Sequence, residues 1–564
     1  MPYANLAEMF QDVARRLGPK TALRYKKDGL YRDLPWDDYR TQVERAAAGL
    51  ISLGLVLGDR VAISSENRFE WLLADLAMLS AGIADVPLHA SLVPRQVAYQ
   101  LEDSGARAIF VSGQGQADKF LSVQKSLPNV QFVIAFDRVD WSGSIPCLTW
   151  EGLKERGAQY LTQHPDAVQD RIRALSRESL ATIIYTSGTT GNPKGVMLSH
   201  GNLLSNAEGM LAVSAVEPDD IMLSWLPYSH IYARTCDHYT PMMGESIVAL
   251  AENMDTLVRN LAEVQPTWMT AVPRFYEKVW SMVEHLPAEV RKAKLPQVFG
   301  PRLKFLSSGG AALPVRIANG FEECGIKLLQ GYGLTETSPV ISFNRRDYYK
   351  LASVGDPLPG VEVKIAADGE ILTRGPHVMK GYWQNPEATA EVMEKDGWFH
   401  TGDIGVLDKD NFLFITDRKK DLIVTAGGKN VAPAELERIL TSEPILEHAV
   451  IYGDGRPFIA AILVPNPQML QLRAKELGCS IDAEGEWVTT PALHKFLAER
   501  VEQLMQVVSK PERVKKFLIL ARPLAIEKDE LTPKLSVRRK AIIAKFEKQL
   551  AALYVGEDGK LQTP

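Results

Sequence analysis

An apolar run that opens directly into a loop of glycines, hydroxyls and one lysine constrains this chain more than any other stretch. The run, ATIIY at residues 181–185, has the length and composition of a buried strand. In the segment TSGTTGNPKG that follows, the glycines permit positive φ and let backbone N–H groups turn inward, while the hydroxyls and the lysine add donors and charge. These features predict a cradle for a polyphosphate. Its expected members are Thr186, Ser187, Gly188, Thr189, Thr190, Gly191 and Lys194.

The P-loop of nucleotide triphosphatases is the nearest alternative, and the spacing excludes it. That motif needs two glycines separated by four residues, then Lys, then Ser or Thr. Counted from Gly188, the second glycine position is occupied by Pro193. Lys194 is followed by Gly195, which has no hydroxyl for magnesium. An ordinary polar turn would need Gly or Asn at one or two positions, but not four hydroxyls as well. We therefore expect phosphate binding by a different fold.

Length and composition set the remaining bounds. A chain of 564 residues exceeds the size of a single hydrophobic core, so at least two domains are expected. A net charge of −5 gives no general attraction to nucleic acid. The first residues lack a basic segment followed by an apolar one, and no apolar run is long enough for a bilayer, which favours a cytoplasmic location. Four cysteines without CxxC spacing are expected to be free thiols.

Apolar strands alternate with helical patterns in the first part of the chain. Between Asp59 and Asp137, for example, the strand RVAIS precedes the helical stretch EWLLADLAMLSAG. This alternation predicts an α/β fold with mixed, mostly parallel sheets and flanking helices, whose ligands bind beyond the carboxyl ends of the strands. From Ser353 the sequence becomes β-rich and punctuated by glycine, which predicts a β-rich subdomain. The last part of the chain predicts a small α+β domain.

Two further strand ends carry glycine turns, SSGGAAL after residues 303–306 and GYGLTET after residues 327–330. Their glycines allow the backbone to approach a flat ligand, and the tyrosine offers a ring for stacking against adenine. Magnesium usually takes one or two protein oxygens plus substrate phosphates, so Glu336 beside a threonine hydroxyl is sufficient. The candidate ligand contacts are Gly310, Ala311, Gly331, Tyr332, Gly333 and Thr335.

Three further candidate residues lie on connections or at strand ends. They are His230, Asp403 and Arg418. Asp403 follows a glycine in TGD, where its carboxylate can accept hydrogen bonds from both hydroxyls of a ribose or can simply close an Asx turn. Arg418 ends a strand and offers a fixed, permanent charge for ribose or phosphate. His230 follows a strand and a proline in LSWLPYSHIYAR. Metal ligation with Asp237 and His238 would need a third ligand at zinc-like spacing, which the sequence does not supply, so we discount it.

The motifs together resemble those of one family. YTSGTTGNPKG looks like the phosphate loop of the adenylate-forming superfamily, which comprises acyl-CoA synthetases, peptide-synthetase adenylation domains and luciferases. LPYSH, GYGLTET and TGD resemble that family's histidine, adenine and ribose motifs, in the same order. The segments HIYAR and DGWFHTGDIG are most similar to bacterial long-chain fatty acyl-CoA synthetases. The resemblance covers nearly the whole chain.

The resemblance implies a role for each matched residue. His230 would border the acyl carboxylate, and Thr186 and Glu336 would hold Mg²⁺. Asp403, Ile415 and Arg418 would bind the nucleotide. Lys534, in ELTPKLSVRRK, matches the lysine that promotes adenylation, although many long-chain members carry a lysine two places later, at Ser536 here. In the glycine turn of the C-terminal region, Gly427 and Gly428 would lie against the pantetheine channel.

The implied domains are a large N-terminal domain over residues 1–418 that binds ATP and the acyl group, a hinge over 419–421 with Lys420 as pivot, and a small mobile C-terminal domain over 422–564. The implied reaction is adenylation of a fatty acid by ATP with release of pyrophosphate, then transfer to CoA with release of AMP. In such an enzyme Met242 and Met243 would either line an acyl tunnel or fill the core, and both readings stay open.

Three alternatives to this reaction stay open: an acyl-AMP ligase that loads an acyl carrier protein, a ligase for medium-chain or aryl acids, and a non-enzymatic nucleotide-binding or membrane-associated protein. Between Lys510 and Lys548 the chain has 12 Lys and Arg against 5 Asp and Glu. This excess could attract CoA phosphates or anionic lipid, so peripheral contact with the inner face of the membrane also stays open. The oligomeric state is not predicted.

Overall fold

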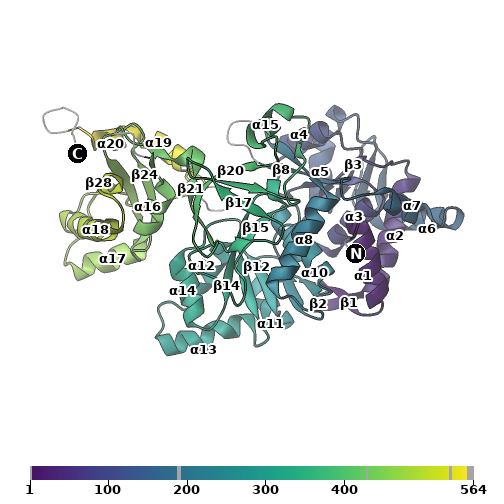
Figure 1. Ribbon diagram of the computed structural model, residues 1–564, viewed down its shortest axis with the longest axis horizontal. Helices are drawn as coiled ribbons and strands as arrows, with labels where there is room; N and C mark the ends of the chain where they lie inside the picture. The colour runs from purple at the N-terminus through teal and green to yellow at the C-terminus, as the bar shows by residue number, and fades with distance from the viewer. Residues whose placement is uncertain (1–2, 187–191, 427–429, 532–536, 556–564) are drawn as a thin grey trace. The chain divides into compact units, whose positions relative to one another are not determined.

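The computed structural model describes residues 3–186, 192–426, 430–531 and 537–555 (Figure 1). The chain forms two compact units. The first comprises Met1–Lys364, Leu372–Thr401 and Leu407–Phe414, and the second comprises Ile365–Ile371, Gly402–Val406 and Ile415–Pro564. Every passage of the chain from one unit to the other lies inside one of four strands. These are β17 (Glu362–Ile365), β18 (Glu370–Arg374), β20 (Phe399–Leu407) and β21 (Leu413–Arg418).

The first unit contains an eight-stranded sheet in the order β19-β9-β8-β4-β3-β5-β6-β7. The strands from β8 to β7 are parallel, and β9 and β19 add an antiparallel edge. The strands are β3 (Arg60–Ser64), β4 (Ala84–Leu88), β5 (Ala108–Val111), β6 (Phe132–Ala135), β7 (Cys147–Thr149), β8 (Leu180–Thr186), β9 (Lys194–Ser199) and β19 (Gly381–Tyr382).

A second sheet of the first unit has nine strands in the order β16-β15-β14-β13-β12-β10-β11-β1-β2. Its middle, from β14 to β1, is parallel, and both edges are antiparallel. The strands are β1 (Thr21–Lys27), β2 (Leu30–Pro35), β10 (Ile221–Ser224), β11 (Ile247–Leu250), β12 (Trp268–Ala271), β13 (Phe305–Ser308), β14 (Leu328–Gly333), β15 (Val340–Phe343) and β16 (Asp356–Pro357).

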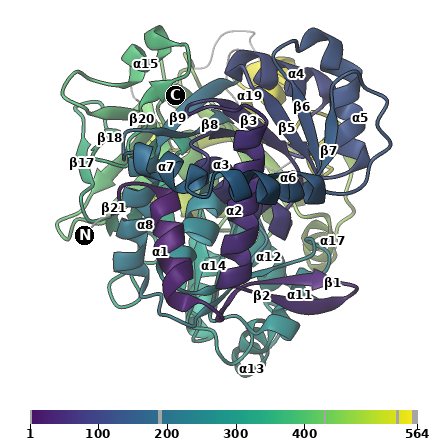
Figure 2. The same cartoon turned by 90° about the vertical axis from the view of Figure 1, so that its right-hand side faces the viewer.

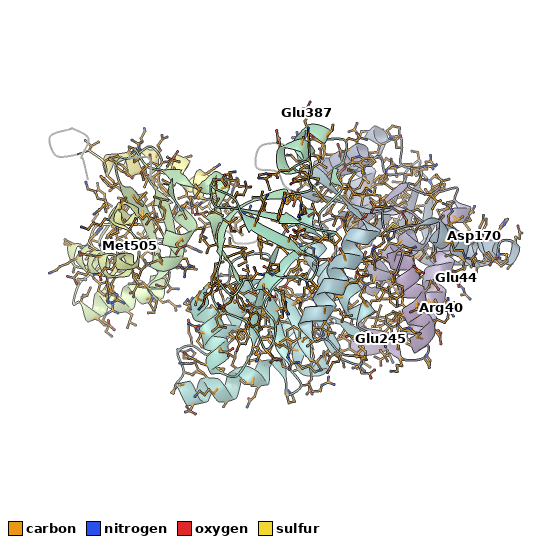
Figure 3. The ribbon with its side chains drawn as sticks, viewed as in Figure 1. Arg40, Glu44, Asp170, Glu245, Glu387 and Met505 are labelled. Atoms are coloured by element: carbon orange, nitrogen blue, oxygen red, sulfur yellow. The ribbon has the colours of Figure 1, made fainter. Side chains whose placement is uncertain are left out.

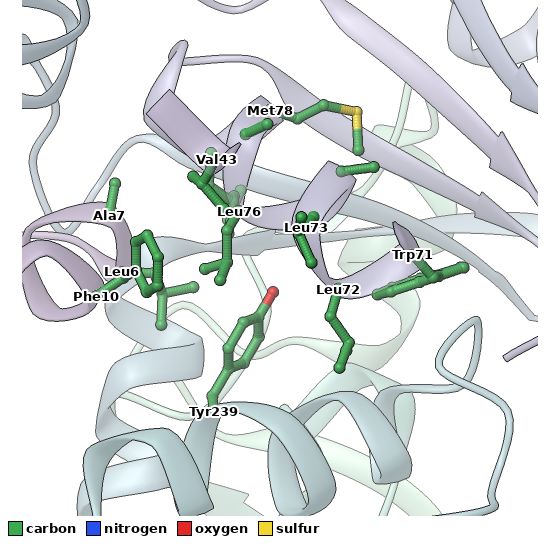
Figure 4. Packing of buried hydrophobic residues seen from close by; sticks show 14 of the residues in the cluster. Leu6, Ala7, Phe10, Val43, Trp71, Leu72, Leu73, Leu76, Met78 and Tyr239 are labelled. Carbon is green, nitrogen blue, oxygen red and sulfur yellow. The ribbon is translucent and has the colours of Figure 1, made fainter. Parts of the chain in front are cut away.

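The largest hydrophobic core joins side chains from both sheets to the helices between them. The helix α3 (Phe69–Ser80) is buried at every residue from Trp71 onward, which its almost uninterrupted apolar sequence permits. The close-up in Figure 4 shows Leu76 of α3 near Phe10 of α1 (Leu6–Leu17), while Leu72 lies farther along the cluster toward Trp71. The helix α8 (His200–Ser214) is also mostly buried and begins with a capping box at Ser199.

The helix α2 (Trp36–Ser52) shows how an outer helix joins this core. Its stripe of Trp36, Tyr39 and Val43 is buried, whereas Arg40 and Glu44 lie on the outward side (Figure 3). The helix α6 crosses α2 in Figure 2. The remaining helices of the first unit are α4 (Pro94–Ser104), α5 (Gln114–Val123), α6 (Trp150–Gln163), α7 (Ala167–Ala174), α9 (Ile231–Ala233), α10 (Thr240–Met243), α11 (Leu257–Val264), α12 (Pro273–Ser281), α13 (Ala288–Phe299), α14 (Val315–Glu323) and α15 (Pro386–Val392).

The second unit is built on a three-stranded sheet in the order β24-β25-β28, with hydrophobic clusters from separate sets of residues. The sheet comprises β24 (Leu446–Tyr452), β25 (Ile459–Pro465) and β28 (Val514–Ile519). The helices are α16 (Pro433–Leu440), α17 (Pro467–Glu476), α18 (Pro491–Leu504), α19 (Arg539–Lys545) and α20 (Glu547–Ala552). The predicted fold class, a large α/β part with mixed sheets and a small α+β part, is thereby confirmed. The placement of a hinge at 419–421 stays a prediction.

Candidate active site

The two strands that flank the predicted phosphate loop place Thr186 and Lys194 opposite each other. Thr186 ends β8, Lys194 begins β9, and the two residues are partners in the antiparallel register. Ser187, Gly188, Thr189, Thr190 and Gly191 lie outside the described residues.

Two side chains of helix α4 form hydrogen bonds to the residues next to Thr186 and Lys194. The hydroxyl of Tyr185 donates to the Asp103 carboxylate at 2.5 Å, and the hydroxyl of Tyr99 donates to the carbonyl of Pro193 at 3.0 Å. Both strand ends are thus held by side chains of the same helix.

Tyr382 connects this hairpin to the predicted magnesium residue. It lies in β19, which pairs with β9 so that Tyr382 is opposite Val196. Its hydroxyl donates to Oε1 of Glu336 at 2.9 Å, and the Lys194 ammonium lies 4.9 Å from the centre of its ring. Burial and the neighbouring Glu336 carboxylate raise the pKa of the Tyr382 hydroxyl, so it remains a donor. The structure therefore brings Thr186, Lys194 and Glu336 into one neighbourhood.

Sequence reasoning missed Tyr382. It stands in GYWQNPEAT, which the sequence identifies only as part of a β-rich, glycine-punctuated stretch. The one local signal was its position within a Gly-Tyr-Trp run. Its role depends on the pairing of β19 with a strand about 185 residues earlier in the chain. The periodicity of the sequence does not predict a pairing between such distant segments.

The nucleotide contacts predicted in the two glycine turns, SSGGAAL and GYGLTET, lie at the carboxyl edge of the second sheet. The adjacent parallel strands β10, β12, β13 and β14 end there. Gly310 and Ala311 are exposed just beyond β13, while Gly331, Tyr332 and Gly333 form the end of β14. Thr335 and Glu336 follow in a short 3₁₀ turn, η3 (Thr335–Thr337). Parallel strand ends are where open α/β sheets bind ligands.

Glycine is required at one of these positions by close packing. A Cβ added to Gly333 would lie 1.7 Å from the carbonyl oxygen of Pro339. The absence of a side chain therefore lets β14 run close to the segment that follows Glu336.

His230 is exposed after β10 and caps the short helix α9. Its ring Nδ1 accepts a hydrogen bond from the backbone N–H of Tyr232 at 3.2 Å. The hydroxyl of Tyr232 lies 3.3 Å from the Ser307 hydroxyl in β13. This contact attaches the His230 connection to the strand that leads to Gly310.

The candidates Asp403, Ile415, Arg418 and Lys420 belong to the second unit. Asp403 is buried on β20, and its Oδ1 lies 3.3 Å from Nε of Arg418 at the end of β21. Ile415 is partly exposed on β21. The pKa of the Lys420 ammonium is lowered. Burial is the main cause, and the positive charge of the nearby Arg418 adds to it. The predicted pair of ribose contacts is thus brought together. Gly427, Gly428 and Lys534 lie outside the described residues.

Several side predictions can be compared with the structure. Asp237 and His238 are buried and bonded to other side chains, and the described part of the chain holds no group of three or more His, Cys, Asp or Glu that could bind a metal ion. Met242 lies in the largest core cluster and Met243 packs against it, which supports the core-filling alternative. All four cysteines are free. None of the described helices is both long enough and apolar enough to span a membrane.

The donor set near the loop is compatible with magnesium. Thr186 supplies a hydroxyl oxygen and Glu336 a carboxylate oxygen, and neither nitrogen nor sulfur ligands are involved. Hard Mg²⁺ prefers such oxygens and completes its shell with water and substrate phosphates, so a cluster of three acidic residues is not needed.

The candidate site lies at the carboxyl ends of parallel strands, as in α/β enzymes that bind nucleotides. The chain belongs to the AMP-binding enzyme family. Residues 10–383 match the family described as AMP-binding enzyme, and residues 420–558 match the AMP-binding enzyme C-terminal domain. The predicted membership of the adenylate-forming superfamily is thereby confirmed.

Individual relatives are named as ligases of long-chain fatty acids. The long-chain-fatty-acid–CoA ligase FadD15 of Mycobacterium tuberculosis is 34% identical over 572 residues, which covers 93% of this chain and 93% of the relative. The long-chain-fatty-acid–CoA ligase ACSBG1 of Homo sapiens is 29% identical over 623 residues, covering 98% of this chain and 86% of the relative.

Solved structures share the fold. The anthranilate CoA ligase AuaEII in complex with anthranoyl-AMP has a TM-score of 0.75 and 19% identity, covering 98% of this chain and 99% of that chain. A fatty acyl CoA synthetase of Mycobacterium tuberculosis has a TM-score of 0.65 and 21% identity, covering 97% and 99%. At these identities the comparison establishes the common fold and nothing finer.

Proposed function

We propose that the protein is an AMP-forming ligase that joins long-chain fatty acids to CoA. It would transfer AMP from ATP to the fatty acid, release pyrophosphate, and then pass the acyl group to the thiol of CoA. One observation carries this proposal. Tyr382 contacts Lys194 through its ring and donates a hydrogen bond to Glu336 through its hydroxyl, which links the predicted phosphate residue to the predicted magnesium residue. The names of relatives that align over 93% of the chain support the acid and the thiol acceptor.

The residues must first overcome the repulsion between two anions, a carboxylate and a triphosphate. Lys194 and the hydroxyl of Thr186 would bind the β and γ phosphates, and Tyr382 would hold the Glu336 carboxylate in place. Mg²⁺, when bound at Glu336 and Thr186, would neutralise charge on the phosphates. In-line attack on the α phosphorus then needs positioning and charge stabilisation more than covalent help from the protein.

Other side chains would orient the two substrates. His230 would lie beside the acyl carboxylate, and Tyr332 would stack on adenine. Asp403 would accept hydrogen bonds from the ribose hydroxyls, and Arg418 would hold that carboxylate in place. Lys534 would stabilise the charge that develops at the α phosphorus.

In the second step Gly427 and Gly428 would admit the pantetheine arm of CoA, after the C-terminal domain has turned about Lys420. The acyl adenylate hydrolyses readily, so water must be excluded until the thiol arrives.

A location in the cytoplasm, with contact to the inner face of the membrane, is part of the proposal. The basic stretch Lys510–Lys548 supports it only weakly, because Arg522, Arg539 and Lys545 are engaged in ion pairs within the second unit.

The proposal is tested by incubating the purified protein with ATP, Mg²⁺, CoA and single acids from acetate to oleate. We expect oleoyl-CoA and AMP as products by mass spectrometry, with oleate used far better than acetate. Acyl transfer to a purified acyl carrier protein but not to CoA would instead identify a carrier-protein ligase. Best use of a medium-chain or aryl acid would correct the substrate class.

A further inference from the structure

A buried cluster of charges lies outside the phosphate loop and centres on Arg234. Its side chain is 0% exposed. The guanidinium lies 2.5 Å from Asp75 and 2.6 Å from Asp85, and it donates to the Thr182 hydroxyl at 2.8 Å. Its Nε donates to the hydroxyl of Tyr239, which in turn donates to Asp75, each at 2.8 Å. Every one of these partners is buried, so the cluster forms an ionic network within the core.

The segment that carries Arg234 has an unusual backbone. Residues Arg234–Tyr239 form a π-helix, η2, that continues directly from the short helix capped by His230. π-helical turns are rare and occur frequently at functional sites. Figure 4 shows Tyr239 of η2 with its hydroxyl directed toward α3, the helix that also provides Asp75. The π-helix is therefore held by a charged network and not only by apolar packing.

The π-helix is also bonded to the second sheet and to the Glu336 turn. The buried Asp237 carboxyl accepts from the hydroxyl of Ser224 in β10 at 3.1 Å and from that of Thr270 in β12. The hydroxyl of Thr235 donates to the carbonyl of Ser338 at 2.7 Å. Hydrogen bonds from one short segment thus reach both sheets and the residues just after Glu336.

The contact with Thr182 points to the phosphate loop. Thr182 is in β8, four residues before Thr186, and β8 delivers the chain into that loop. His230 stands four residues before Arg234. Because η2 is bonded to β8 and continues from the helix capped by His230, a shift of η2 against β8 would change the position of His230 relative to Thr186.

The two carboxyl groups that contact Arg234 have pKa values shifted in opposite directions. Burial raises the pKa of Asp85, while at Asp75, against the effect of burial, Arg234 holds the pKa below its usual range. Arg234 contacts both carboxylates at nearly the same distance, and its bonds to Asp85 and Thr182 attach it to β4 and β8.

We infer that Arg234 is a positioning residue for adenylation, which fixes the π-helix against β8 and thereby aligns the acyl carboxylate beside His230 with the triphosphate in the loop. This inference rests on the proposed function. Misplacement of reacting groups by about 1 Å can cost about 100-fold in rate, so even a small shift of η2 should be measurable.

Two substitutions test the positioning role of Arg234 without creating a large cavity in the core. Thr182→Val keeps the shape of the side chain and both carboxylate contacts of Arg234. It removes the hydroxyl that joins Arg234 to β8 and that also donates to the backbone carbonyl of Asp85 at 3.1 Å. Arg234→Lys keeps the charge and loses the planar fork, which cannot be replaced by one ammonium. Thr240→Val is the matched control, because the Thr240 hydroxyl is buried directly after η2 with no hydrogen-bond partner in the described part of the chain.

The measurements are fatty-acid-dependent exchange of pyrophosphate into ATP, and acyl transfer to CoA from preformed acyl adenylate. We expect about 10-fold lower kcat for exchange in both test variants, with KM for ATP and fatty acid within about 3-fold of the wild-type values. Acyl transfer by the folded variants should stay close to wild type, although their melting temperatures should fall because buried partners lose hydrogen bonds. Thr240→Val should match wild type throughout.

Wild-type kcat for exchange in both folded test variants would overturn the positioning role. Equal loss of both half-reactions would also overturn it, since that would indicate a general structural defect. If Thr182→Val does not fold, Arg234→Lys decides alone. Absence of exchange in the wild-type protein would contradict the proposed function itself, whereas an active wild type with unaffected variants would contradict only this inference.

Discussion

The hydroxyl of Tyr382 donates a hydrogen bond to the carboxylate of Glu336 at 2.9 Å, and its ring faces the ammonium of Lys194. One side chain thus holds the predicted metal residue and contacts the predicted phosphate residue. This arrangement leads to the first of several testable predictions.

Tyr382→Phe should weaken magnesium-dependent adenylation while leaving the fold intact. The substitution removes the hydrogen bond to Glu336 but keeps the ring that faces Lys194. A buried hydrogen bond to a charged group contributes about 1.5–3 kcal/mol, so we expect about 10-fold lower exchange activity at limiting Mg²⁺. The measurement is pyrophosphate exchange as a function of Mg²⁺ concentration, with partial recovery expected at high Mg²⁺. An unchanged magnesium dependence would show that Tyr382 does not support the metal site.

Asp403→Ala should abolish recognition of the ribose. The wild-type carboxylate, kept beside Arg418, would accept hydrogen bonds from both ribose hydroxyls. We expect the wild-type enzyme to prefer ATP over 2′-deoxy-ATP by about 10-fold or more in kcat/KM, because a site built for a hydroxyl rejects the analogue that lacks it. In the variant this preference should disappear. A variant that still discriminates between the two nucleotides would assign ribose recognition elsewhere.

Glu530→Gln should destabilise the second unit at neutral pH. The Glu530 side chain is 1% exposed and lies 2.6 Å from both Arg522 and Lys545. Burial alone would raise the pKa of Glu530, but hydrogen bonds from Arg522 and Lys545 lower it to about 2 from an ordinary value of 4.5.

Because the folded pKa lies below the unfolded one, this stabilisation is present above about pH 4.5 and is lost as the pH falls toward 2. Hydrogen exchange of β28 and α19 should therefore be faster in Glu530→Gln than in wild type at pH 7. The difference should shrink below pH 4.5. A difference that is independent of pH would contradict the assignment.

Lys534→Ala should separate the two half-reactions. If Lys534 stabilises charge at the α phosphorus, its loss should reduce adenylation about 10²- to 10³-fold. Transfer to CoA from preformed acyl adenylate should be nearly unchanged, because the phosphate has already reacted. Both rates are measured on the same preparation. An equal fall in the two rates would show that the division of labour is wrong.

Much of the fold could be predicted because local pattern and global structure agree. The strand over Arg60–Ser64 has the bounds that its sequence RVAIS indicates. The glycine turns after β13 and at the end of β14 were also correctly expected, since adjacent parallel strands of one sheet end at the same edge. Thr186 ends β8 in the other sheet, as its sequence indicates.

The parts that could not be predicted depend on contacts between distant residues. Arg234, Asp237 and His238 are charged or polar, and their composition alone favours the surface. Arg234 and Asp237 are buried because partners on α3, β4, β10 and β12 satisfy them, and sequence separation conceals those partners. The same reason explains why Tyr382 was overlooked.

The central claim is that this site activates a fatty acid by transferring AMP to it. The most direct measurement is exchange of labelled pyrophosphate into ATP by the purified protein, with oleate and Mg²⁺ present and CoA absent. The account predicts exchange that requires oleate and falls at least about 100-fold in Glu336→Ala. Formation of ADP and phosphate, or exchange that is independent of both oleate and Glu336, would contradict it.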